Sequence, residues 1–137
     1  MLALLVCAAT ALNAQAATKV KDPSLECRYK RTGRWSDQDV KATIRCATRK
    51  WSVPGGYAKA RAVAACESGF NEHDRNSSSS AAGVYQFLSG TWASVLHRHH
   101  HLAYRWGLSD RVLNARANVV RAIQLAHGGG WGPWSCA

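Results

Sequence analysis

One carboxylate in this sequence stands where acid–base chemistry could be done. Glu67 follows Cys66 in "ACESGFN", after an alanine-rich segment and before the polar loop "NEHDRNSSSS", residues 71–80. A carboxyl group at the end of a buried helix is desolvated, which disfavours its charged form and suits it to donate a proton near neutral pH. We therefore expect Glu67 to act as an acid. The alternative is a solvated helix end, or a partner for Arg61 or Arg75.

The residues that follow Glu67 suit a sugar ligand. The loop supplies amides and hydroxyls, and the aromatic residues supply faces that match the apolar side of a sugar ring. The residues that we expect to contribute faces and donors are Tyr85, Gln86, Trp92, Trp131 and Trp134. For each aromatic ring the alternative is a place in the core. For Ser68, Asn71 and Gln86 it is a hydrogen bond within a loop or turn.

An ordered series of residues resembles the soluble lytic transglycosylases, lysozyme-like enzymes that cleave peptidoglycan. The series comprises Glu67, Ser68, Phe70, Asn71, Ala82, Gly83, Gln86, Phe87, Thr91 and Trp92. The chain is even more similar to the resuscitation-promoting factors. Their Cys-Glu-Ser-Gly start, Gln-Phe, Thr-Trp and terminal Gly-Trp-Gly-x-Trp before Cys match Cys66 to Gly69, Gln86-Phe87, Thr91-Trp92 and Gly130 to Cys136. The match covers about residues 55–137.

The resemblance implies a fold and a set of site residues. The fold would be of the α+β class, predominantly α and lysozyme-like, with a small β-hairpin and disulfides. Glu67 would be the catalytic acid, then the base, at the bond between N-acetylmuramic acid and N-acetylglucosamine. We expect neither a cofactor nor a metal, and the expected substrate-binding residues are Ser68, Asn71, Tyr85, Gln86, Thr91, Trp92 and Trp131.

A second catalytic group is not evident from the sequence. Glycosidases commonly use two carboxylates, and the downstream acids here are Glu72, Asp74 and Asp110. Glu72 and Asp74 lie in the loop and could hold a water molecule, but neither falls where the resemblance demands an acid. Substrate-assisted chemistry removes the requirement, because the N-acetyl carbonyl of the sugar can serve as the nucleophile. Attack by the 6-hydroxyl would then give a 1,6-anhydro product, which we favour, and attack by water would make the enzyme a muramidase.

Four helices are predicted to position these residues. Ser36 with Asp39 has the pattern of a capping box and predicts a helix that ends before "SVPGG", residues 52–56. A second helix should begin near residues 54–57 and stop at Gly69; its alanines make it thin, so we expect it to be central and largely buried. A third, capped by Ser89 or Thr91, should continue through the histidines. The last should run from a Ser109 cap to residues 128–130, and "AAGVYQF", residues 81–87, could form a hairpin strand.

The N-terminal third of the chain indicates export. Residues 1–16 form a short apolar segment that ends in Ala-Gln-Ala, the pattern of a signal peptide, with a buried N-terminal helix as the alternative. Residues 17–54 would be an arm and helix packed on the domain of residues 55–137, with no transmembrane segment. We expect the protein to be secreted and associated with the cell wall.

Four cysteines remain after the signal peptide, Cys27, Cys46, Cys66 and Cys136, an even set that predicts two disulfides rather than a zinc site. The residues themselves leave three pairings open. The resemblance implies a Cys66–Cys136 bridge, which would leave Cys27 and Cys46 to each other.

The net charge of +10 is carried entirely by residues after the signal peptide and should attract polyanions. We expect peptidoglycan strands and anionic cell-wall polymers as partners of a monomeric protein. A dedicated reader of nucleic acid is disfavoured, because the basic residues form no compact block. The four histidines in "HRHHH", residues 97–101, could bind a metal or charge in acid, but a solvated helix end is the favoured interpretation.

Two other functions fit the same composition. One is a cell-wall-binding module that keeps the cleft without catalysis. The other is a cationic protein that binds membranes or nucleic acid.

Overall fold

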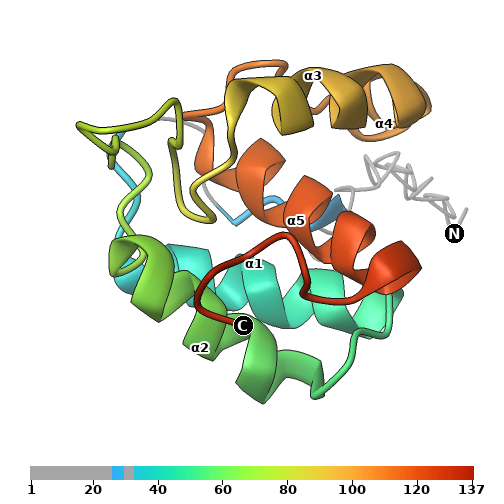
Figure 1. Ribbon diagram of the computed structural model, residues 1–137. Coiled ribbons are helices and arrows are strands. Elements are labelled where there is room, and N and C mark those ends of the chain that lie inside the picture. The colour runs from blue at the N-terminus through green and yellow to red at the C-terminus, as the bar shows by residue number, and fades with distance from the viewer. Residues whose placement is uncertain (1–25, 30–32) are drawn as a thin grey trace, which may run out of the picture.

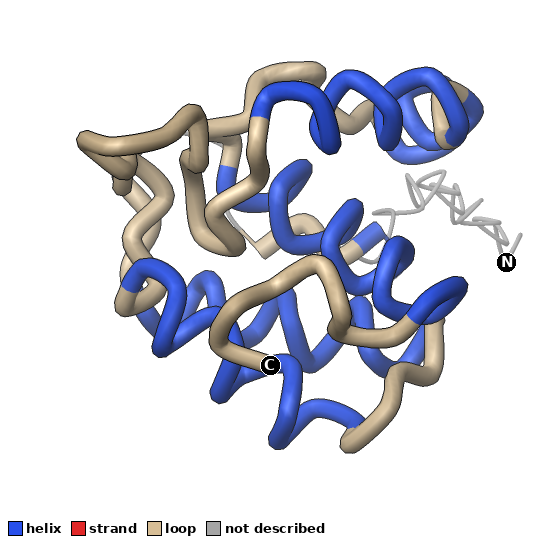
Figure 2. The backbone as a smooth tube through the Cα atoms, in the orientation of Figure 1, coloured by secondary structure: helices blue, strands red, loops and turns tan. Residues whose placement is uncertain are grey.

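A computed structural model describes residues 26–29 and 33–137, and this part of the chain is mostly helical (Figures 1 and 2). Its helices are α1 (Asp37–Lys50), α2 (Gly56–Ser68), α3 (Ser89–Arg98), α4 (His101–Trp106) and α5 (Ala115–Gly129). None of these helices is long and apolar enough to cross a membrane. The expected signal peptide and most of the arm lie outside the described residues.

Helix α1 forms as its sequence predicts. The Ser36 side chain accepts a hydrogen bond from the Asp39 N–H, and the Asp39 side chain accepts one from the Ser36 N–H, which completes the capping box. The apolar stripe of α1, which includes Val40, Ile44 and Ala47, is buried. This stripe packs against α5, and α1 also contacts α2.

The central helix is α5, and the expectation that α2 would be central was wrong. In Figure 1, α5 runs between the α1–α2 pair and the α3–α4 pair. Most residues of α5 from Ala115 to Ile123 are fully buried, whereas α2 buries only Ala60, Val63 and Ala64. The physical reason is side-chain size: the branched residues of α5 remove far more apolar surface from water than alanines can.

Several helix boundaries differ from those predicted. Helix α5 begins at an Asn114 cap, whose side chain accepts from the Ala117 N–H, and not at Ser109. The Ser109 hydroxyl instead accepts from the Arg111 N–H within a turn. The helix predicted through the histidines is interrupted, because α3 ends at Arg98 and α4 begins at His101. The predicted cap of α3 at Ser89 or Thr91 was wrong: the capping position is Leu88, which makes no side-chain hydrogen bond to the helix.

The predicted hairpin is reduced to isolated bridges, and the described residues contain no strand. Ala82 bridges both Arg75 and Phe87. Between Ala82 and Phe87 the chain reverses in a turn, with left-handed backbone at Gly83 (φ 81°) and Gln86 (φ 46°). A reversal this tight leaves no room for a run of paired residues.

Two disulfides are present, Cys27–Cys46 and Cys66–Cys136, which confirms the expected pairing. The first joins the arm to α1. The second joins the last turn of α2 to the C-terminal tail, which passes beside α2 in Figure 1. The arm at Cys27 and the tail at Cys136 are therefore covalently attached to the helical body.

Candidate active site

The carboxylate of Glu67 lies in the last turn of α2 and is held by the C-terminal tail. Its Oε1 atom accepts a hydrogen bond from the Cys136 N–H at 3.2 Å and one from the Ser135 hydroxyl at 3.4 Å. Among the described residues no donor reaches Oε2. The side chain is half-buried, so Glu67 is less desolvated than the predicted central helix would have made it. One oxygen is thus anchored while the other is open to a ligand.

Local structure places Glu67 at this point. Gly69 adopts a left-handed conformation (φ 60°) and its N–H bonds to the carbonyls of Ala64 and Ala65, which ends the helix. The Cys66–Cys136 bridge then brings the tail against the same turn. The glutamate therefore sits where a helix end and a covalently tethered tail meet.

Two tryptophans that precede Cys136 hold the tail in place. Trp131 donates its ring N–H to the Pro54 carbonyl at 2.8 Å, and Trp134 donates to the Tyr85 carbonyl at 2.8 Å. Both rings are buried, and they contact each other with centroids 5.3 Å apart. The donors that anchor Glu67 are therefore positioned by packed side chains and by the disulfide together.

The predicted site residues Ser68 and Gln86 hold the turn that follows the polar loop, Ser68 from α2 and Gln86 from within the turn. The Ser68 hydroxyl donates to the Val84 carbonyl at 2.7 Å. The Gln86 amide donates to the carbonyls of Gly83 (2.9 Å) and Asp74 (3.2 Å). Gln86 is half-buried and adopts φ 46°, an uncommon conformation for a residue with a side chain. Strain of this kind tends to occur at functional sites, which keeps Gln86 a candidate.

Three of the predicted substrate-binding rings belong to the core. Tyr85 has no exposed surface, donates its hydroxyl to the Ala60 carbonyl at 2.9 Å, and has its pKa raised well above the usual value by burial. Trp92 donates its ring N–H to the Asp110 carbonyl. Trp92 is 7% exposed and Trp131 is 6% exposed. The polar groups of all three rings donate hydrogen bonds to carbonyls within the protein. A direct contact between Tyr85 and substrate does not fit its complete burial, and we correct that expectation.

The remaining two predicted contacts lie nearer the surface. The Asn71 side-chain oxygen accepts from the His73 N–H at 3.0 Å, the turn interaction considered as its alternative. Thr91 is half-buried in the first turn of α3. The polar loop also borders a cavity of about 540 Å³, lined by His73, Arg75 and residues 111–114.

Sequence reasoning missed Asn118, which holds the turn beside the site from within α5. Its Oδ1 accepts from the Tyr85 N–H at 2.8 Å, and its Nδ2 donates to the Val112 carbonyl at 2.8 Å. Asn118 is fully buried and lies within a helical stretch of apolar residues. An amide at such a position was the available signal, because a buried polar group must find partners.

The other acids near the site, Glu72, Asp74 and Asp110, differ in their burial and in whether their carboxylates have partners within the protein. Glu72 is buried, accepts from the Trp35 N–H at 2.9 Å and lies 3.4 Å from the His73 ring nitrogen. Asp110 lies 3.4 Å from the Arg121 guanidinium. Asp74 is half-buried, and its carboxylate makes no hydrogen bond or ion pair with the described residues. Glu72 is therefore a structural anchor, and Asp74 is the loop acid that stays open to a ligand.

No group of three or more His, Cys, Asp or Glu side chains in residues 26–29 and 33–137 is arranged to hold a metal ion, including the histidines near residue 100. No protein-family model matches the chain, and neither a curated protein nor a solved structure matches it.

Proposed function

We propose that this protein is a secreted, lysozyme-like enzyme that cleaves the glycan strands of peptidoglycan, with Glu67 as its single essential carboxylate. The observation that carries the proposal is the asymmetric environment of Glu67. Its Oε1 is anchored by the Cys136 N–H and the Ser135 hydroxyl, while Oε2 has no donor among the described residues. A general acid needs this arrangement, because the oxygen that delivers the proton must be free to face the leaving group.

The chemistry follows from one carboxyl group and the substrate itself. Glu67 protonates the glycosidic oxygen as the bond to C1 of N-acetylmuramic acid breaks. The carbonyl oxygen of the adjacent N-acetyl group bonds to C1 and balances the developing charge. The Glu67 carboxylate then removes a proton from the 6-hydroxyl of the same sugar. The 6-oxygen attacks C1 as the bond from C1 to the N-acetyl oxygen breaks, which restores the N-acetyl group and gives a 1,6-anhydro end. If water attacks instead, the product carries a reducing end.

The burial of Glu72 supports this route over one in which Glu72 is the second carboxylate. The contacts of Glu72 with the Trp35 N–H and the His73 ring both involve Oε1, as the contacts of Glu67 do. Glu72 has only 6% exposure, however, so its carboxylate is less accessible to a substrate or a water molecule than that of half-buried Glu67. The two disulfides support the proposed export, since such bridges persist in oxidising compartments.

The test compares the wild type with Glu67→Gln on purified sacculi, following turbidity, muropeptide release and pelleting with the walls. The glutamine keeps an oxygen that can accept from the Cys136 N–H but cannot supply a proton. We expect muropeptide release to fall by about 10²- to 10⁴-fold, with binding and melting temperature retained.

Three outcomes would contradict the proposal. If both proteins bind walls and neither releases muropeptides, the chain is a binding module. If neither pellets with walls at low salt while both bind DNA or anionic vesicles, it is a cationic binder. If Glu67→Gln cleaves at the wild-type rate, another residue supplies the acid. Mass spectrometry of the fragments separates anhydro ends from reducing ends, which differ by one water.

A further inference from the structure

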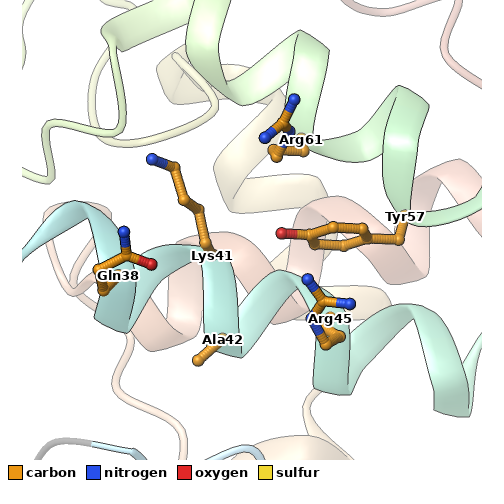
Figure 3. A pocket seen from close by; sticks show the side chains of 6 residues that line it. All are labelled: Gln38, Lys41, Ala42, Arg45, Tyr57 and Arg61. Carbon is orange, nitrogen blue, oxygen red and sulfur yellow. The ribbon is translucent and has the colours of Figure 1, made fainter.

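A second candidate site lies between α1 and α2, in a pocket of about 310 Å³ (Figure 3). Helix α1 contributes Gln38, Lys41, Ala42 and Arg45, and helix α2 contributes Tyr57 and Arg61. The spacing explains why these residues converge: side chains three or four residues apart share one face of a helix. Figure 3 shows the Lys41 side chain extending from α1 toward α2, and the Tyr57 ring lying over the Arg45 guanidinium.

The lining of this pocket carries three cations and no acid. Arg45 lies over the Tyr57 ring at 4.2 Å, and the Lys41 ammonium lies over the Phe70 ring at 4.5 Å. Lys41 also reaches Asp37 at 3.7 Å, but Asp37 is largely exposed at the rim. Arg61 makes no hydrogen bond or ion pair with any residue that the structure describes. Like charges four residues apart repel on a helix, so this cluster is expected to favour a counter-anion.

We propose that this pocket binds the phosphate groups of an anionic cell-wall polymer. The identity of the polymer rests on the proposed wall function, whereas the site itself does not. Donors reach the pocket from both helices, as the cations, the Gln38 amide and the Tyr57 hydroxyl. A tetrahedral phosphate accepts hydrogen bonds from many directions, whereas a planar carboxylate is satisfied by a single arginine fork.

The surroundings favour a polyol phosphate over nucleic acid. Single-stranded nucleic acids gain affinity by stacking bases on aromatic faces. Tyr57 is the aromatic residue of this pocket, and Arg45 covers one of its faces. A phosphodiester with a small, flexible linker suits a compact cavity better than a chain of bases does.

The pocket is separate from Glu67 although both involve α2. Arg61 and Glu67 are six residues apart, which places them about 9 Å apart along the helix axis and about 120° apart around it. Helix α1, which supplies most of the pocket, lies outside the region that resembles peptidoglycan-cleaving enzymes. Binding of wall polymer and cleavage of glycan can therefore occur on different faces of the protein.

The test measures binding of the full chain to poly(glycerol phosphate), poly-glutamate and single-stranded DNA of matched charge, at one ionic strength. The pocket variant is Arg45→Gln/Arg61→Gln. The control is Arg49→Gln/Arg105→Gln, which removes the same charge from exposed positions outside the pocket. We expect the pocket variant to bind poly(glycerol phosphate) about tenfold more weakly, and the control to change by less than about threefold.

A titration of the unaltered protein with inorganic phosphate makes the test independent of the variants. Amide signals of residues 38–45 and 57–61 should shift most. The proposal would be overturned if the pocket and control variants lost equal affinity for poly(glycerol phosphate), or if inorganic phosphate shifted amide signals elsewhere in the protein. It would also be overturned if the wild type bound poly-glutamate as tightly as poly(glycerol phosphate), or bound single-stranded DNA more tightly. Failure of catalysis on sacculi stripped of phosphate polymer would count against the role of Glu67 and leave the pocket proposal intact.

Discussion

The atoms around Glu67 and Gly83 show how closely single residues constrain the candidate active site. The Glu67 Oε1 position depends on a backbone N–H of the tail. The turn opposite depends on Gly83, because a Cβ there would come within 2.3 Å of Asn118 Nδ2 and 2.7 Å of the Val112 carbonyl. Gly83 also has φ 81°, which a side chain disfavours. The turn therefore requires glycine for both space and conformation.

We expect Gly83→Ala to lower the free energy of unfolding by about 2–4 kcal/mol, since it combines overpacking with backbone strain. The matched control is Gly90→Ala in α3, where a Cβ meets nothing within 4 Å. The control should raise stability by about 0.5–1 kcal/mol, because alanine is the better helix former. Thermal or denaturant unfolding measures both, and a Gly83→Ala variant as stable as the wild type would contradict the close packing of this turn against Asn118.

Two loop acids should respond differently to neutralisation. Glu72→Gln weakens the contact to the Trp35 N–H and should cost about 1–3 kcal/mol of stability, with turnover per folded molecule unchanged. Asp74→Asn should change turnover by less than about threefold, because substrate-assisted chemistry needs no second carboxylate. Muropeptide release corrected for folded fraction measures both. A hundredfold loss in Asp74→Asn would identify it as a second catalytic group.

At the scale of the elements, the junction between α3 and α4 couples the histidine segment to the core. The pKa of His99 is lowered, first by partial burial and then by the charges of Arg98, His101 and Arg121. A histidine with a lowered pKa in the folded state binds fewer protons than it does in the unfolded chain. Its contribution to stability is therefore complete above the ordinary pKa of 6.5 and is lost as the pH falls through the lower folded value.

We expect the melting temperature of the wild type to fall as the pH decreases below about 6.5, and His99→Gln to reduce that dependence. The control is His97→Gln on the exposed side of α3, which should retain the wild-type slope. Identical slopes in the wild type and His99→Gln would contradict the assignment. The prediction concerns stability alone and involves no metal.

At the scale of the whole molecule, contacts between residues far apart in the sequence hold the described part of the arm and the C-terminal tail on the helical body. Arg116 on α5 donates to the carbonyls of Glu26, Trp106 and Gly107, at distances from 2.7 to 3.2 Å. Burial lowers the pKa of Arg116 to about 10, and that cost is offset by these hydrogen bonds. The two disulfides act in the same way on the arm and the tail.

The two bridges should differ in their effect on function. Cys66 and Cys136 are 70 residues apart, and Cys27 and Cys46 are 19 apart. By loop-closure entropy, replacement of the first pair with serine should cost about 4 kcal/mol and replacement of the second about 3 kcal/mol. Because the first bridge positions the Cys136 N–H on Glu67, its loss should also reduce muropeptide release per folded molecule. Equal specific activity in the two variants would contradict this role of the tail.

The sequence by itself determined the features that depend on neighbouring residues. The Ser36 capping box and the Gly69 stop set the bounds of α1 and α2 through contacts within a few positions. The glutamate at the end of α2 and the even set of cysteines could be recognised in the same way. Local hydrogen bonds and backbone preferences are strong enough to decide these features before the chain is packed.

Only the tertiary structure decided which residues are exposed and which partners they use. Tyr85 was predicted to contact a sugar but is fully buried in the core. Glu72 accepts a hydrogen bond from the Trp35 N–H of the arm, and Asn118 accepts one from the Tyr85 N–H and so holds the turn. The same reason explains why the central helix is α5 and not α2, as the sequence predicted. Burial and polar pairing depend on groups that are far apart in the chain. Which side chains are buried, and which polar groups they pair with, is therefore decided only when all the helices pack around one core.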